Sequence, residues 1–272
     1  MQAWAEEALR MRLETGTVEE HRETGGGYRV LVLRCPSISD AVKPGQFVHL
    51  RVPALAERVL RRPFSVYRAV AGTISILYKR VGAGTAAMCR LRTGEAVDLL
   101  GPLGNGFPPP SAGAMPVVVA GGYGMAALCL VAERAGSKGI AFAGGAGAAD
   151  ILCADEFRRL GWEVRVATED GSAGSRGLVT DILNSWLEQC PGSLTPEFFV
   201  CGPMGLLRAI AARVAATKWK AWLSLDRNMG CGLGACLACV QKVRSADAAQ
   251  GWKWARICTE GPVFESRQVV WE

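Results

Sequence analysis

Four cysteines near the C-terminal end constrain this chain more than any other feature of its sequence. Cys231, Cys236 and Cys239 follow the spacing Cys-x4-Cys-x2-Cys, and eighteen residues separate Cys239 from Cys258. This spacing is typical of plant-type two-iron, two-sulfur clusters. Glycines at 232 and 234 can adopt positive φ, which lets the backbone wrap closely around a small inorganic core. The pattern therefore predicts a 2Fe-2S cluster whose metal ligands are these four thiolates.

Three alternative roles for the four cysteines stay open from sequence alone. They could be buried structural thiols, or they could form disulfides. They could also bind zinc, although structural zinc usually takes two close cysteine pairs and Cys258 stands alone. Residues 1–16 carry several charges and no apolar run, so no signal peptide is expected. The six remaining cysteines lie in apolar surroundings, which indicates reduced core thiols in a cytoplasmic protein: Cys35, Cys89, Cys129, Cys153, Cys190 and Cys201.

The length and charge of the chain indicate a protein of two or three domains that binds anionic cofactors. The chain has 272 residues, enough for two compact domains or three small ones. Its formal net charge of +6 suits anionic cofactor phosphates, and no segment resembles a nucleic-acid-binding module. The longest apolar run, 117–131, is interrupted by glycines and is too short for a membrane span.

The N-terminal part of the chain has the alternating pattern of β-strands. Residues 28–33, 47–52 and 73–78 alternate apolar and polar side chains, and short strands at regular spacing favour a small antiparallel barrel. Residues 1–12 are expected to form a short amphipathic helix or a loose tail.

Two segments of the expected barrel could bind a flavin nucleotide. The strand Arg62-Pro63-Phe64-Ser65 can present a cation to a pyrophosphate and a hydroxyl to a flavin ring. The second segment is a glycine loop before a helix, which offers free N–H groups to phosphate; its candidate residues are Tyr78, Lys79, Val81, Gly82, Gly84 and Thr85. An ordinary edge strand and a simple turn would also account for these two segments.

Beyond a proline-rich stretch at 108–113 the pattern becomes that of a parallel α/β sheet. A buried strand at 117–120 leads into Gly121, Gly122 and Gly124 and then a helix, which is the dinucleotide-binding arrangement. Strands are expected at 139–143, 163–168 and 197–201, with helices at about 150–160, 177–190 and 203–217. The segment Cys201-Gly202-Pro203-Met204 follows a strand at the edge where such sheets bind ligands. A tight crossover loop is the alternative for each glycine turn.

These segments predict a multidomain β and α/β protein with three parts. Residues 1–112 would form an antiparallel β-barrel that binds a flavin nucleotide, 113–219 a parallel-sheet domain that binds a dinucleotide, and 220–272 a small 2Fe-2S module.

In motifs and in order of parts the chain resembles the ferredoxin–NADP reductase superfamily. More narrowly it resembles the electron-transfer subunits of the two-subunit, NAD-linked dihydroorotate dehydrogenases of bacteria. The motifs that carry the resemblance are Lys43-Pro44-Gly45-Gln46-Phe47, Arg62-Pro63-Phe64-Ser65, Ala120-Gly121-Gly122, residues 167–172, Cys201-Gly202-Pro203, and the cysteine block through Gly261-Pro262-Val263-Phe264.

The resemblance implies a specific electron route. NADH would give hydride to FAD, the flavin would pass single electrons to the cluster, and the cluster would pass them to an FMN-containing dihydroorotate dehydrogenase subunit of pyrimidine biosynthesis. Two copies of each chain would form a heterotetramer, and no side chain here would be a catalytic acid or base. The alternatives are an NAD(P)H reductase serving a ferredoxin or a hydrogenase, and a zinc-stapled regulatory nucleotide-binding protein.

The sequence also predicts NADH over NADPH. The loop expected to reach the adenosine ribose, 144–150, contains no basic residue, and Asp150 would repel a 2′-phosphate.

Overall fold

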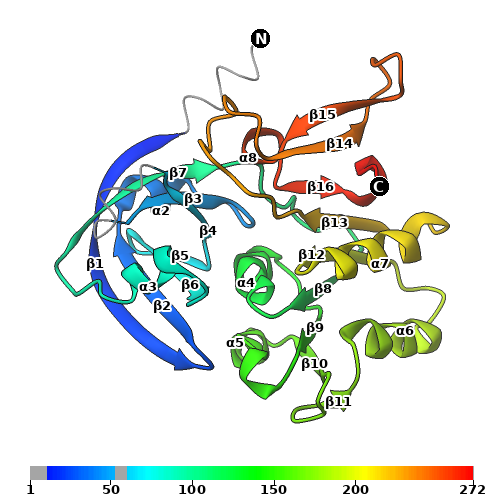
Figure 1. Ribbon diagram of the computed structural model, residues 1–272. Coiled ribbons are helices and arrows are strands. Elements are labelled where there is room, and N and C mark those ends of the chain that lie inside the picture. The colour runs from blue at the N-terminus through cyan, green and yellow to red at the C-terminus, as the bar shows by residue number, and fades with distance from the viewer. Residues whose placement is uncertain (1–10, 53–59, 272) are drawn as a thin grey trace.

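The structure, a computed structural model, describes residues 11–52 and 60–271. Most of the segment predicted as an N-terminal helix or tail therefore lies outside the described residues. A curved antiparallel sheet lies beside a layered α/β unit, and the C-terminal hairpin projects from one end (Figure 1). Within the described ranges, no helix is long and apolar enough to cross a membrane.

The first sheet has seven antiparallel strands in the order β4-β3-β7-β1-β2-β6-β5. Alternate side chains of β2, β3 and β6 point inward and build an aliphatic core with Leu31, Leu50 and Ile76. The sheet curls until β4 contacts β6, so the predicted antiparallel barrel is confirmed. Its strands are β1 (Arg12–Gly25), β2 (Tyr28–Arg34), β3 (Phe47–Arg51), β4 (Arg62–Ser65), β5 (Arg68–Val70), β6 (Thr73–Lys79) and β7 (Ala96–Leu103), and its two short helices are α2 (Pro36–Ala41) and α3 (Ala83–Met88).

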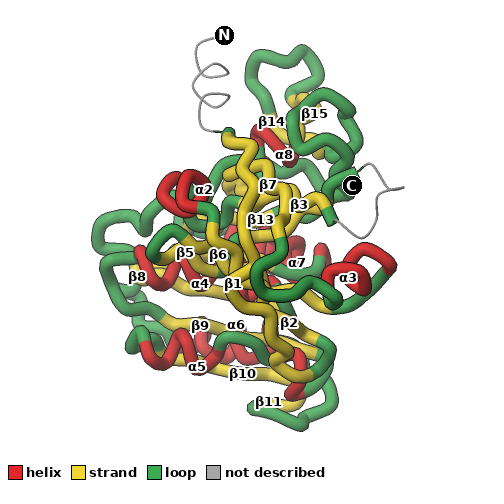
Figure 2. Tube along the Cα trace, turned by 90° about the vertical axis from the view of Figure 1, so that its left-hand side faces the viewer, coloured by secondary structure: helices red, strands yellow, loops and turns green. Residues whose placement is uncertain are grey.

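The second sheet has the order β11-β10-β9-β8-β12-β13-β16 and is parallel except for β16. Its strands are β8 (Met115–Gly121), β9 (Ile140–Gly145), β10 (Glu163–Thr168), β11 (Ser175–Arg176), β12 (Pro196–Cys201), β13 (Lys220–Ser224) and β16 (Val263–Glu265). The strands β8, β9 and β10 follow one another down the view in Figure 2. Val118 and Ala141 face one side of this sheet, whereas Val117 and Ile140 face the other.

Helices cover both faces of the second sheet, as expected for a βαβ series. On the face towards the barrel lie α4 (Gly124–Arg134) and α5 (Ala154–Arg159). On the opposite face lie α6 (Val179–Gln189) and α7 (Met204–Ala215). A short 3-10 turn, η1 (Ala148–Asp150), follows β9. The helix predicted after the glycine turn is present as α4. The three helices predicted at about 150–160, 177–190 and 203–217 are also present, each shorter at both ends than predicted.

The C-terminal segment leaves the second sheet and returns to it. After β13 the chain forms the cysteine loop, the hairpin β14 (Val240–Arg244) and β15 (Trp252–Arg256), and α8 (Ile257–Glu260). Strand β16 then pairs with β13, and η2 (Ser266–Gln268) follows. Because β13 begins at residue 220 and pairs with β12, the second sheet extends into the segment expected as a separate module. The placement of boundaries at 112 and 219 stays a prediction.

Candidate functional site

The cysteine loop presents backbone donors to sulfur. The N–H groups of Leu233 and Cys236 point at Cys231 Sγ, at 3.3 and 3.5 Å. Gly232 and Gly234 have φ of +72° and +78°, which turns successive N–H groups inward. Burial raises the pKa of the Cys231 thiol, but these hydrogen bonds outweigh it and bring the pKa to about 7. The loop therefore favours a thiolate, the form that ligates metals.

The four predicted ligands form two pairs. Cys236 lowers the pKa of the Cys231 thiol, and Cys239 raises the pKa of the Cys258 thiol, so the side chains within each pair interact. The backbone N–H of Ile257 donates to Cys239 O at 2.9 Å, which joins the loop to α8. Burial, followed by the neighbouring Cys239, raises the pKa of the Cys258 thiol.

Across the described residues, no three His, Cys, Asp or Glu side chains lie close enough together to hold one metal ion. A structural zinc needs four ligands around one point, whereas a two-iron cluster needs four cysteines spread over a longer core. All ten cysteines are free thiols, so the disulfide alternative is wrong.

The residues predicted to bind FAD come together on the barrel. Strand β4 pairs with β3, and the Phe64 ring packs edge-on against the Tyr78 ring with centroids 6.0 Å apart. A Cβ on Gly84 would lie 2.9 Å from Arg62 Nε, so the arginine of the strand covers the glycine loop. Thr85 Oγ1 accepts the N–H of Val81 at 2.9 Å and of Gly82 at 3.1 Å. The guanidinium of Arg62 therefore lies beside the glycine loop, and the Thr85 hydroxyl holds the backbone of that loop in place.

Two of the residues predicted to bind FAD, Tyr78 and Lys79, have side chains that bond other residues of the chain. The Tyr78 ring is buried in the barrel core, and its hydroxyl bonds His21 Nε2 at 2.9 Å. Lys79 Nζ lies 3.0 Å from Asp150 Oδ1, and Tyr28 Oη donates to the same oxygen at 2.7 Å. Hydrogen bonds from Tyr28 and Lys79 hold the pKa of Asp150 below its ordinary value.

This contact adds a basic residue that the sequence interpretation of the loop 144–150 did not include. The loop 144–150 contains no basic residue of its own, but Lys79 of β6 reaches it from the barrel and faces Asp150. Tyr28 was missed as a site residue because nothing local in the sequence connects it with Asp150, 122 residues further along the chain.

The two glycine turns predicted to bind the nicotinamide nucleotide abut each other. Strands β8 and β12 are neighbours, and both turns lie at the carboxyl edge of the sheet. A Cβ on Gly124 would lie 2.3 Å from Cys201 O, and one on Gly121 would lie 2.9 Å from Pro203 Cδ. Glycine is required here because the turns approach so closely. Both α4 and α7 begin at this edge, where free N–H groups can bind phosphate.

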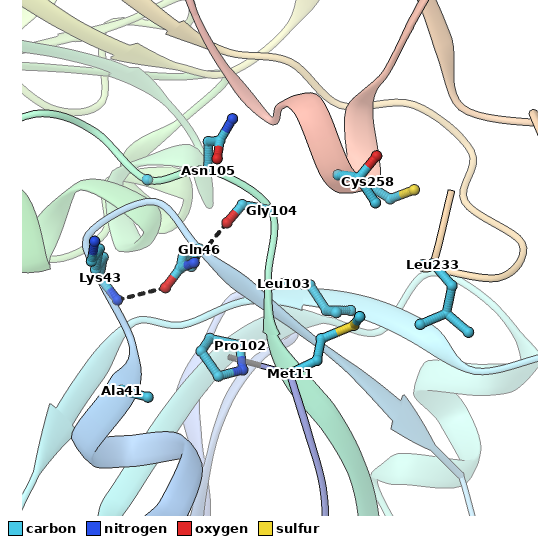
Figure 3. Close-up of a pocket in the computed structure, with 13 residues that line it drawn as sticks. Met11, Ala41, Lys43, Gln46, Pro102, Leu103, Gly104, Asn105, Leu233 and Cys258 are labelled. Atoms are coloured by element: carbon cyan, nitrogen blue, oxygen red, sulfur yellow. Dashed lines mark hydrogen bonds between the residues drawn. The ribbon is translucent and has the colours of Figure 1, made fainter. Parts of the chain in front are cut away.

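A cavity of about 130 Å³ lies where the barrel meets the cysteine loop (Figure 3). Leu233 and Cys258 line one side of it and Leu103 lines the other. Beside it, Asn105 donates its backbone N–H to Gly261 O at 2.5 Å and its side-chain amide to Glu260 O at 2.9 Å. Asn105 was not predicted as a site residue, and these bonds tie the end of β7 to the segment that follows Cys258.

Comparison with known proteins gives consistent matches. The profile of the iron–sulfur cluster binding domain of dihydroorotate dehydrogenase B matches residues 226–270. The chain is 37% identical over 242 residues to the "Dihydroorotate dehydrogenase B (NAD(+)), electron transfer subunit" of Desulforamulus reducens, covering 87% of this chain and 90% of the relative. It is 34% identical over 267 residues to the protein of the same name from Geobacillus sp., covering 96% and 99%.

Solved structures agree on the fold. The structure of an NADH-dependent reduced ferredoxin-NADP oxidoreductase superposes with a TM-score of 0.79 at 25% identity, over 94% of this chain and 90% of that one. The cytochrome b5 reductase domain of Ulva prolifera nitrate reductase superposes with a TM-score of 0.57 at 16% identity, over 72% and 89%, which shows the fold alone. The predicted fold class, multidomain β and α/β, is confirmed.

Proposed function

This chain belongs to the family of dihydroorotate dehydrogenase B (NAD(+)) electron transfer subunits, and we propose that it passes electrons between NAD(H), FAD and a 2Fe-2S cluster and on to a catalytic partner subunit. The observation that carries this proposal is the loop of Cys231, Cys236 and Cys239, in which the N–H groups of Leu233 and Cys236 point at the Cys231 sulfur. When bound, a flavin can take two electrons as hydride and release them singly, which links a nicotinamide to a one-electron cluster.

The cluster would be held by Cys231, Cys236, Cys239 and Cys258. The amides of Leu233 and Cys236 stabilise negative charge on sulfur, and the same hydrogen bonds would make the cluster easier to reduce. Cys239 and Cys258 are buried, whereas Cys236 is exposed, so one end of the site would approach the surface.

FAD would bind along β4 and the loop that precedes α3. Arg62 lies over Gly84 and would pair with the pyrophosphate, while Ser65 and the Phe64 ring would hold the flavin ring. The backbone of Val81, Gly82 and Thr85 would complete this site. Because the Tyr78 ring is buried and Lys79 pairs with Asp150, these two residues would contribute through their backbone.

The nicotinamide nucleotide would bind at the carboxyl edge of the second sheet. Gly121, Gly122 and Gly124 lead into α4, and Cys201, Gly202, Pro203 and Met204 lead into α7. The close approach of these turns supports a nucleotide that lies across both, since the backbone leaves no side chain between them.

The partner would be an FMN-containing dihydroorotate dehydrogenase subunit, with two copies of each chain. The names of the relatives support a catalytic partner, because each describes an electron transfer subunit. Leu233 and Leu237 of the cysteine loop are 43% and 61% exposed, so an apolar surface lies at the cluster. Such a surface favours close docking of another protein at the point where electrons leave.

Iron content and co-expression test the proposal. The purified chain should contain flavin and two irons, and Cys258→Ser should lose most of the iron but keep the flavin, because thiolate is the preferred soft ligand. Cys190→Ser is the matched control, since Cys190 lies at the end of α6, outside the cluster loop. Co-expression with an FMN-containing dihydroorotate dehydrogenase subunit should produce a stable complex that reduces NAD⁺ with dihydroorotate. A zinc-containing, colourless chain would refute the proposal.

A second function is favoured by one comparison. The solved structure at 25% identity is that of an NADH-dependent reduced ferredoxin-NADP oxidoreductase. If the chain carries flavin and iron but neither binds nor serves the dihydroorotate dehydrogenase subunit, reduction of a ferredoxin with NADH would identify it as a reductase of that kind.

A further inference from the structure

His49 is a buried histidine in strand β3. Its side chain is fully buried, and neither Nδ1 nor Nε2 has a hydrogen-bond partner among the described residues. Buried polar side chains in folded proteins are almost always hydrogen-bonded, so each exception requires a physical cause. An acceptor that is not part of the polypeptide would provide one.

The imidazole of His49 lies between the flavin strand and the cysteine loop. His49 is directly opposite Pro63 of β4, so their side chains share one face of the sheet. A Cβ on Gly232 would lie 2.9 Å from both Nδ1 and Cε1 of His49. The Nδ1 edge of the ring therefore faces the cysteine loop at the residue next to Cys231.

No side chain in the described part of the chain accepts a hydrogen bond from His49. Phe47, whose ring centroid is 5.7 Å away, and the opposing residues Pro63 and Leu100 are apolar. Arg61, the nearby charge, can only donate. Burial, with a smaller effect of Arg61, lowers the pKa of His49 to about 4, so the ring is neutral at pH 7 and carries one N–H.

We propose that His49 donates this N–H to a sulfur of the cluster held by the cysteine loop, and thereby stabilises its reduced form. The proposal rests on the proposed function, because it requires the cluster. A reduced cluster carries one more negative charge, and hydrogen bonds to its sulfurs are among the factors that set its potential. His49 would thus raise the reduction potential of the cluster, and it would not act on a substrate.

Selective labelling with ¹⁵N-histidine tests the proposal directly, because the chain contains only two histidines. The other, His21, bonds Leu91 O and Tyr78 Oη in the barrel. Pulsed EPR of the reduced cluster in the labelled, otherwise unchanged chain should show a ¹⁵N coupling. The coupling should persist in His21→Gln and disappear in His49→Phe, which keeps a planar ring but has no donor.

A redox titration followed by EPR gives a second measurement. His49→Phe should lower the equilibrium constant for cluster reduction about tenfold, a shift of about 59 mV for one electron. His49→Gln, which keeps an N–H, should recover part of the shift. A clear cluster signal without histidine coupling, or an unchanged potential in His49→Phe, would overturn the proposal and leave the proposed function intact. A chain without any cluster signal would overturn both, and if His49→Phe does not fold, the labelled unmutated chain decides alone.

Discussion

Replacing Gly104 by alanine should loosen the junction between the barrel and the cysteine loop. Gly104 has φ of +72°, and a Cβ there would lie 2.5 Å from Gly261 O and 2.7 Å from Pro262 Cδ. The matched control is Gly94→Ala. Gly94 has φ of +89°, and a Cβ there would have no neighbour within 4 Å. The two variants therefore share the backbone strain and differ in the clash.

The expected magnitudes follow from that difference. The left-handed conformation costs an alanine about 1–2 kcal/mol, which is the whole expected effect of Gly94→Ala. At Gly104 the added methyl must also displace a packed segment, a further ~1–3 kcal/mol. It would disturb the bond from Asn105 N to Gly261 O as well, a net loss of about 0.5–1.5 kcal/mol.

Thermal unfolding followed by circular dichroism measures the difference. At about 2–4 °C per kcal/mol for a chain of this size, Gly104→Ala should melt at least ~3 °C below Gly94→Ala. Iron content should also fall only in Gly104→Ala, because the displaced Gly261 follows Cys258 by three residues. Equal melting temperatures and equal iron in the two variants would show that the contact at Gly104 does not hold the loop.

Three further outcomes are expected. Gly124→Ala should weaken NADH binding at least ~10-fold in a fluorescence titration, because its Cβ would lie 2.3 Å from Cys201 O; Gly205→Ala, which meets nothing within 4 Å, should bind normally. The stability that the depressed pKa of Asp150 contributes is present above the ordinary carboxyl pKa of about 3.9 and is lost as pH falls through the lower folded value. The urea concentration at the unfolding midpoint, measured from pH 2 to 7, should therefore fall less at low pH in Asp150→Asn than in the unchanged chain. An equal fall in both would contradict this. Finally, kcat/KM with an artificial acceptor should be higher for NADH than for NADPH, and an equal or higher value for NADPH would end that prediction.

Local patterns in the sequence were sufficient for most of the fold. Strand β10 has the bounds that its pattern predicted, and the glycine turn before α4 marks where strand changes to helix. The helix α2 was missed because its six residues, Pro36–Ala41, carry no helical period. Only packing against the barrel core, where Ile38 is buried, selects a helix there.

The site was predictable only where its residues are close in sequence. The cysteine spacing and the glycine turns are local signals. The contacts of Asp150 with Tyr28, of His49 with Gly232 and of Asn105 with Gly261 join segments far apart in the chain. These contacts depend on how the two sheets and the cysteine loop pack, which no local pattern encodes.

The pairing of β13 with β16 has a consequence for protein engineering. Ser224 pairs with Val263, and Leu225 N donates to Pro262 O at 2.9 Å, so the chain leaves and re-enters the sheet at one place. Residues opposite each other in antiparallel strands have Cα atoms about 4.5–5.5 Å apart. A short glycine linker could therefore replace residues 226–261 without stretching either strand. The shortened chain would keep both sheets and would lack all four predicted cluster ligands.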